Sequence, residues 1–95
     1  MSLVFEWDAN KAESNLAKHD VSFEEAMTVF ANPLARIFPD EEHSIDELRE
    51  IIIGHSARQQ IILISFKATE NKVRIISARR ATRREPKDYE ENIGS

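Results

Sequence analysis

Residues 74–85 read RIISARRATRRE, and this stretch decides the fold that the sequence predicts. Ile75 and Ile76 are β-branched and apolar, which favours a position inside a β-sheet. Thr82, with Glu85 three residues later, matches the capping box that begins a helix. The stretch therefore predicts a strand that runs directly into the first turn of a helix.

Four arginines crowd this junction, at positions 79, 80, 83 and 84. Guanidinium groups held so close together are costly unless an anion lies between them, and their planar fork fits a phosphate group. Arg79 and Arg80 are consecutive strand residues, so we expect them to point to opposite faces and to have different roles. The alternative is ion pairing with the acidic first half of the chain, for example with Glu24 or Glu25.

Arg83 and Arg84 fall in the first turn of the predicted helix. Positive side chains there oppose the helix dipole, while the same turn offers free backbone N–H groups to an anion. The junction therefore predicts a phosphate-binding edge. A solvated basic face, with Glu85 and Asp88 nearby, is the alternative.

Two helices are predicted before the central strands. Asp8 is a suitable N-cap for a helix over residues 9–19. Ser22 and Glu25 form a second capping box, which begins a helix that extends to about residue 30. The residues of the second helix expected to face the core are Phe23, Ala26, Met27 and Phe30.

Apolar runs predict five strands, at residues 4–7, 34–38, 48–55, 60–67 and 73–79. Short turns join the last three strands, so these form an antiparallel meander. The two N-terminal helices would cover one face of the sheet, and the helix from residue 83 to about residue 92 would cover part of the other. The predicted fold class is α+β, with one domain over residues 1–95 and an exposed acidic loop at residues 40–47.

The composition excludes several kinds of site. The chain has no cysteine, which excludes disulfides and thiolate metal ligands and is compatible with a reducing cytoplasm. His19, His43 and His55 are too scattered in sequence to suggest a zinc site, so neither metal nor cofactor is expected. No apolar run approaches the ~18 residues of a membrane span, and the first residues lack a signal-peptide pattern. We expect a soluble cytoplasmic protein without membrane contact.

Charge is distributed unevenly along the chain. The net charge of −4 argues weakly against binding to nucleic acid. Residues 1–57 carry −8, however, whereas residues 58–87 carry +7. Such a chain can present one basic face despite an acidic isoelectric point, unless its two halves neutralise each other.

Three segments resemble the BrnT family of bacterial type II toxins. They are FEWDANKAESNLAKHDVSFEEAMTVF at residues 5–30, IIIGHS at residues 51–56 and RIISARRATRREPKDYE at residues 74–90. Their order and spacing match over nearly the whole chain. The resemblance implies a fold similar to RelE-type toxins and a ribonuclease that arrests translation. It also implies a BrnA-like ribbon-helix-helix antitoxin as the partner, with DNA contacted only through that antitoxin, and it leaves open a dimer within the antitoxin complex.

The chain departs from the family pattern at two places. Asp20 follows His19 where members usually have glycine. Phe66 is followed by Lys67-Ala68-Thr69, where members often have Thr-Glu-Arg, so an arginine that is a plausible catalytic group in relatives is missing. Either Lys67 replaces the charge of that arginine or the activity is weakened.

Metal-independent RNA cleavage needs a base for the 2′-hydroxyl proton, an acid for the leaving 5′-oxygen and cations for the crowded phosphorane. Arg79 and Arg80 are the leading candidates for phosphate contact. His55 and Lys67 end neighbouring strands and are further catalytic candidates. Alternatively, His55 hydrogen-bonds the turn and Lys67 protects a sheet edge. The candidates for RNA binding are Arg58, Arg83 and Arg84.

Two other functions remain open at this stage. One is a non-catalytic module that only binds its antitoxin, which the missing arginine favours. The other is direct DNA binding by the arginine-rich helix start, although the acidic residues 88–91 argue against long contact with a DNA groove. Of these readings, a metal-independent endoribonuclease toxin accounts for most of the residues.

Overall fold

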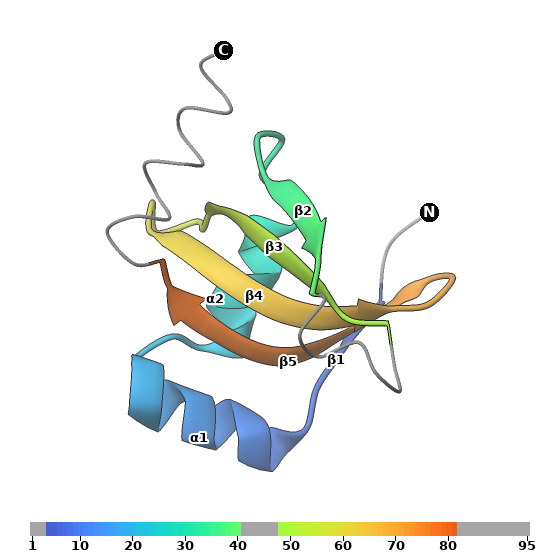
Figure 1. Cartoon of the computed structure of the whole chain (residues 1–95). Helices are drawn as coiled ribbons and strands as arrows, with labels where there is room; N and C mark the ends of the chain where they lie inside the picture. Colours follow the sequence, from blue (N-terminus) through green and yellow to red (C-terminus); the bar gives the residue numbers. More distant parts are fainter. Residues whose placement is uncertain (1–3, 41–47, 82–95) are drawn as a thin grey trace.

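The protein is described by a computed structural model over residues 4–40 and 48–81. Two helices pack against one face of a five-stranded sheet whose strand order is β1-β5-β4-β3-β2 (Figure 1). The elements are β1 (Val4–Glu6), α1 (Ala9–His19), α2 (Phe23–Val29), β2 (Arg36–Pro39), β3 (Glu50–His55), β4 (Ile61–Ala68) and β5 (Lys72–Arg80). The predicted α+β class is confirmed.

The bounds of both helices follow from their caps. The Asp8 carboxylate accepts hydrogen bonds from the backbone N–H groups of Asn10 and Lys11, at 2.8 and 3.1 Å, and so begins α1. Asp20 ends α1 in the left-handed conformation, with φ of 56°. Ser22 Oγ accepts from the Glu25 N–H at 3.0 Å and begins α2. Both predicted helix starts are therefore confirmed.

The sheet is mixed, so the prediction of an antiparallel sheet is only partly right. β2, β3, β4 and β5 pair antiparallel with their neighbours, as expected from their short turns. β1, however, pairs with β5 in parallel. A parallel pair needs a long connection, which the two helices and three strands between β1 and β5 provide.

The core lies between the helices and the sheet. Trp7 stacks edge-on against Phe23 at 5.8 Å between ring centroids, and Phe30 contacts both Phe5 and Phe66 in the same way, at 5.2 and 5.1 Å. All four residues predicted to face inward from the second helix take part, two of them fully buried. The buried core residues are Val21, Phe23, Ala26, Val29, Ile52, Ile62, Ile64, Phe66, Val73, Ile75 and Ala78.

The predicted loops and ends need several corrections. The strand expected at residues 34–38 is β2, which begins and ends later and lies exposed at one edge of the sheet. Asp40 was expected to be exposed with the acidic loop, but it is buried, and its N–H donates to the Arg49 carbonyl at 2.9 Å. The rest of that loop, the capping box at Thr82 and the C-terminal helix lie outside the described residues. In the described part of the chain, no helix is long and apolar enough to cross a membrane.

Candidate functional site

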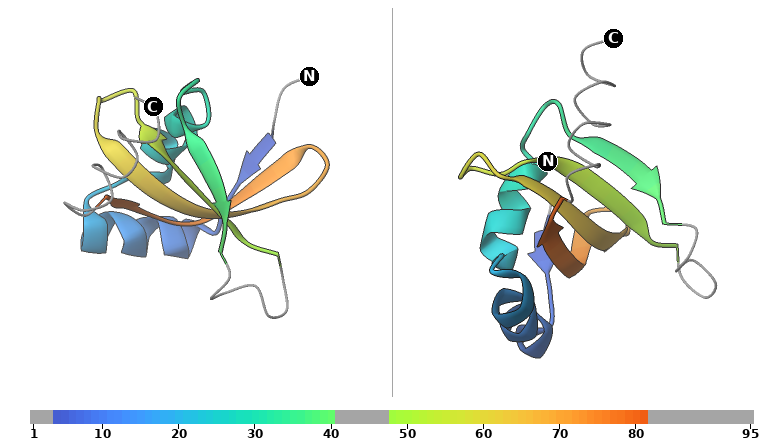
Figure 2. Two further views of the ribbon diagram at one scale, coloured as in Figure 1. Left: turned by 45° about the horizontal axis from the view of Figure 1, so that its top comes forward. Right: turned by 60° about the vertical axis from the view of Figure 1, so that its left-hand side comes forward.

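The face of the sheet opposite α1 and α2, which we call the outer face (Figure 2), holds three of the five candidate residues that the structure describes, namely His55, Lys67 and Arg79. Because side chains alternate along a strand, residues between the core positions of β3, β4 and β5 point to this face. Cross-strand register then fixes which of them are neighbours. The outer-face residues of these strands are Ile51, Ile53, His55, Ile61, Leu63, Ser65, Lys67, Arg74, Ser77 and Arg79.

Arg79 occupies the end of one cross-strand row on the outer face. It pairs with Leu63 of β4, Leu63 pairs with Ile53 of β3, and Ile53 pairs with Arg36 of β2. The row thus has a guanidinium group at each end and aliphatic side chains between them. Arg79 is half-buried, and its Nη1 donates to the carbonyl of the next residue at 3.3 Å.

Arg80 points to the opposite side, because it pairs with the buried core residue Ile62. Its Nη2 lies 3.5 Å from a carboxylate oxygen of Asp20, and its Nε donates to the Gln60 side chain at 3.2 Å. An intramolecular ion pair was the alternative considered for this arginine, although with Glu24 or Glu25 and not with Asp20. The Asp20 side chain is 86% exposed, so this pair contributes little stability and leaves the guanidinium group near the surface.

His55 lies one row beyond Arg79, towards the end of β3. It pairs with Ile61, whereas the Arg79 row contains Ile53, two residues earlier on the same strand. β3 and β5 flank β4, so the two backbones lie about 10 Å apart across the sheet and about 7 Å apart along it. Both side chains point to the outer face, with their backbones about 12 Å apart on the diagonal.

Lys67 is placed away from this pair. It lies four residues along β4 from Leu63, or about 13 Å from the Arg79 row. Its cross-strand partner is Arg74, whose Nη1 lies 3.5 Å from a carboxylate oxygen of Glu6. These residues border a pocket of about 120 Å³ at the other end of β4. Lys67 therefore does not occupy the same position on the sheet as Arg79 and His55, although all three share one face.

Arg58 lies in the turn between β3 and β4, at the same end of the sheet as His55. Its side chain is 73% exposed, with Nη1 3.8 Å from a carboxylate oxygen of the buried Glu25. Ser56 Oγ donates to the other oxygen of Glu25 at 2.8 Å, which ties the turn to α2. Glu25 thus pairs with Arg58 and with neither Arg79 nor Arg80. The remaining candidates, Arg83 and Arg84, lie outside the described residues.

Two outer-face cations were missed in the sequence, Arg36 and Arg74. Their side-chain direction follows from alternation, but their neighbours follow only from the register between strands. Arg36 in particular lies on the edge strand, far from the arginine cluster in sequence. Among residues 4–40 and 48–81, no group of three histidines or carboxylates lies close enough to hold a metal ion.

The chain matches a known protein family and a solved structure. The family described as "Ribonuclease toxin, BrnT, of type II toxin-antitoxin system" matches residues 7–85. Among solved structures, the chain is similar to the crystal structure of the Brucella abortus ribonuclease toxin BrnT, with 28% sequence identity and a TM-score of 0.64. That alignment covers 87% of this chain and 99% of the Brucella chain. A comparison with curated proteins finds none that matches this chain significantly.

Proposed function

The chain belongs to the BrnT family of ribonuclease toxins of type II toxin–antitoxin systems, and from this premise we propose that it cleaves RNA without a metal ion and thereby arrests translation. The observation that carries the proposal is the placement of Arg79 and His55 in adjacent rows of the outer face. Family membership implies an RNA target and an antitoxin partner. We propose a BrnA-like ribbon-helix-helix antitoxin that links the toxin to DNA.

Cleavage of this kind begins when the 2′-oxygen of a ribose attacks the adjacent phosphorus. The bond to the 5′-oxygen then breaks, which leaves a 2′,3′-cyclic phosphate and a 5′-hydroxyl end. Arg79 would bind the phosphorane through its planar fork, where negative charge increases during the reaction. His55 would accept the proton of the 2′-hydroxyl or donate one to the 5′-oxygen.

The other candidates would contact the RNA on either side of the scissile phosphate. Lys67 is about 13 Å from the Arg79 row, so we assign it to a phosphate further along the strand. Arg58 and Arg80 lie at the end of the sheet that also holds His55, where flanking nucleotides would pass. Arg36 would hold the strand at the far end of the Arg79 row. Such contacts position the backbone without reading its sequence.

The test compares Arg79→Ala with Arg80→Ala, two neighbouring arginines that point to opposite faces. Purified protein is incubated with RNA in the presence of a chelator, and translation is followed in growing cells after induction. We expect Arg79→Ala to lower the cleavage rate about 100-fold or more, because a transition-state contact is lost. Arg80→Ala should lower it about fivefold or less. Full toxicity of both variants would show that the proposed site is wrong.

A second function is favoured by the position of Lys67. Family members often have an arginine in the segment where this chain has Lys67-Ala68-Thr69. The cation that this chain has there, Lys67, lies far from Arg79 and His55. A degenerate toxin that only binds its antitoxin would lack a catalytic cation in this way. Purified wild-type protein that binds the antitoxin tightly, yet cleaves no RNA at any salt concentration, would identify this function instead.

A further inference from the structure

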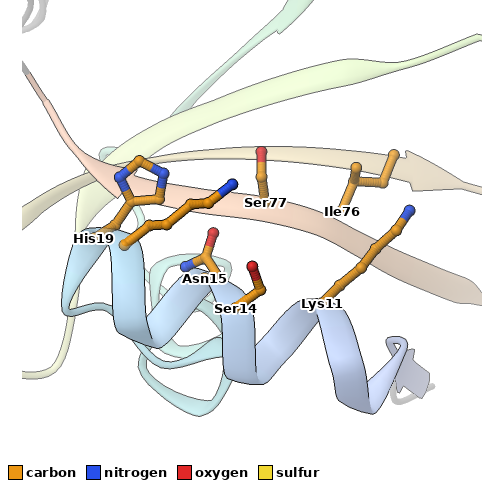
Figure 3. Close-up of a pocket in the computed structure, with 7 residues that line it drawn as sticks. Lys11, Ser14, Asn15, His19, Ile76 and Ser77 are labelled. Carbon is orange, nitrogen blue, oxygen red and sulfur yellow. The ribbon is translucent and has the colours of Figure 1, made fainter.

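A groove of about 190 Å³ lies between α1 and the edge of β5 (Figure 3). In Figure 3, Lys11 and His19 rise from the two ends of α1, with the Asn15 side chain between them and Ser77 opposite on β5. Its lining combines basic side chains and hydroxyl groups with a single aliphatic residue. The lining residues are Lys11, Ser14, Asn15, Lys18, His19, Ile76 and Ser77.

The groove exists because β1 is short. β1 pairs with residues 72–74 only, so the later part of β5 has α1 and not a strand beside it. Asn15 anchors the helix there, since its side chain both accepts from the Ala78 N–H and donates to the Ala78 carbonyl. Lys11 and Lys18 lie one helical turn before and about one turn after Asn15, so all three share the face of α1 that looks towards β5.

The groove is cationic in a chain whose net charge is −4. Within residues 4–40 and 48–81, no carboxylate lines the groove and no ion pair involves Lys11, Lys18 or His19. Lys18 and His19 lie in the last turn of α1, where positive charge is favourable to the helix dipole. Lys11 lies in the first turn, where positive charge is unfavourable, so helix stability does not explain it. A bound anion would offset this unfavourable charge.

We propose that Lys11 and Lys18 of this groove each bind a phosphate of the RNA backbone, which extends the substrate path from the outer face around the edge of β5. The proposal rests on the proposed ribonuclease function. Ser77 connects the two surfaces: it lines the groove, pairs with Ser65 on the outer face and precedes Arg79 by two residues. A strand bound at Arg79 can therefore continue over Ser77 to the lysines. No aromatic side chain of the described residues lines the groove, so it would contact the backbone without stacking on bases.

The experiment uses the full chain and a 2′-O-methyl oligoribonucleotide of roughly 12 nucleotides, which binds but cannot be cleaved. Its affinity is measured over a range of salt concentrations for wild type, for Lys11→Gln with Lys18→Gln, and for Lys11→Arg with Lys18→Arg. All exchanged side chains are exposed, and thermal unfolding verifies that each variant folds. Removing two phosphate contacts should weaken binding about tenfold and reduce the salt slope by about 1.4. The arginine variant keeps the charge and should bind like wild type.

Cleavage kinetics separate this role from catalysis. The glutamine variant should have a raised KM and an unchanged kcat, because the two lysines would contact flanking phosphates and not the scissile one. If wild type cleaves RNA and the glutamine variant matches it in affinity, salt slope and KM, the inference is overturned while the proposed function stands. Loss of antitoxin co-purification with unchanged RNA affinity would overturn it too, and would assign the groove to an acidic peptide. A wild-type protein that neither binds nor cleaves RNA would overturn both proposals.

Discussion

Asn15 makes hydrogen bonds to a residue that is 63 positions away in the sequence. Its side-chain oxygen accepts from the Ala78 N–H at 3.0 Å, and its side-chain nitrogen donates to the carbonyls of Ala78 and Val21 at 2.8 and 2.9 Å. These are the hydrogen bonds that a neighbouring strand would make at this position. The amide therefore satisfies the edge of β5 where β1 no longer does.

Replacing Asn15 should therefore destabilise the whole fold. Asn15→Leu keeps the size of the side chain but leaves one buried N–H and two carbonyls without partners, for a loss of about 3 kcal/mol. Asn15→Asp should be equally harmful at neutral pH, since it places a carboxylate oxygen against two carbonyls. Urea unfolding measures both losses. Asn10→Ala, on the exposed side of the same helix, is the control and should change stability by less than about 0.5 kcal/mol.

Asn15 and Glu25 also show what local patterns cannot predict. The capping-box pattern correctly predicted that Ser22 caps the Glu25 N–H. The carboxylate of Glu25, however, accepts a hydrogen bond from Ser56, which is 31 residues away. Sequence patterns describe neighbours along the chain, whereas these two polar side chains find their partners only after the helices have packed on the sheet.

At the scale of elements, caps and alternation predicted most of the fold. Asp8 correctly set the start of α1, and the apolar runs placed β3, β4 and β5 to within two residues at either end. The parallel pairing of β1 was missed, because its three residues carry no information about strand direction. Arg36 was also missed as an outer-face cation, because its row with Arg79 depends on the register of four strands, which the sequence does not give.

The end of α1 provides a prediction at this scale. Asp20 has φ of 56°, which costs less for glycine than for any other residue. Asp20→Gly should therefore stabilise the protein by about 0.5 kcal/mol, a net value that includes the loss of the weak ion pair with Arg80. This gain in stability should raise Tm by roughly 2–4 °C. Asp20→Asn is the matched control, since it removes the charge but tolerates the same backbone conformation. A Tm that falls equally in both variants would show that the ion pair with Arg80 stabilises the protein more than glycine does by adopting the left-handed conformation at lower cost.

The whole molecule separates its charges in space as well as in sequence. The outer face gathers Arg36, Lys67 and Arg79 from three strands, and the groove beside α1 adds Lys11 and Lys18. The acidic first half contributes Asp20, Glu6 and Glu25 as partners of individual arginines. Among residues 4–40 and 48–81, these ion pairs each join one carboxylate to one arginine. A polyanion can therefore approach a protein whose net charge is −4.

This charge separation predicts strong salt dependence of RNA binding. If five of these cations, Arg36, Lys67, Arg79, Lys11 and Lys18, each contact one phosphate, the slope of log K against log salt concentration should be about −3 to −4 for single-stranded RNA. An oligonucleotide of the same sequence with an uncharged methylphosphonate backbone is the control and should bind only weakly at any salt concentration. The measurement requires purified wild-type protein without antitoxin. A slope near zero would contradict the prediction, because the net negative charge of the chain would then outweigh its basic surfaces, and RNA would have to be held by its bases.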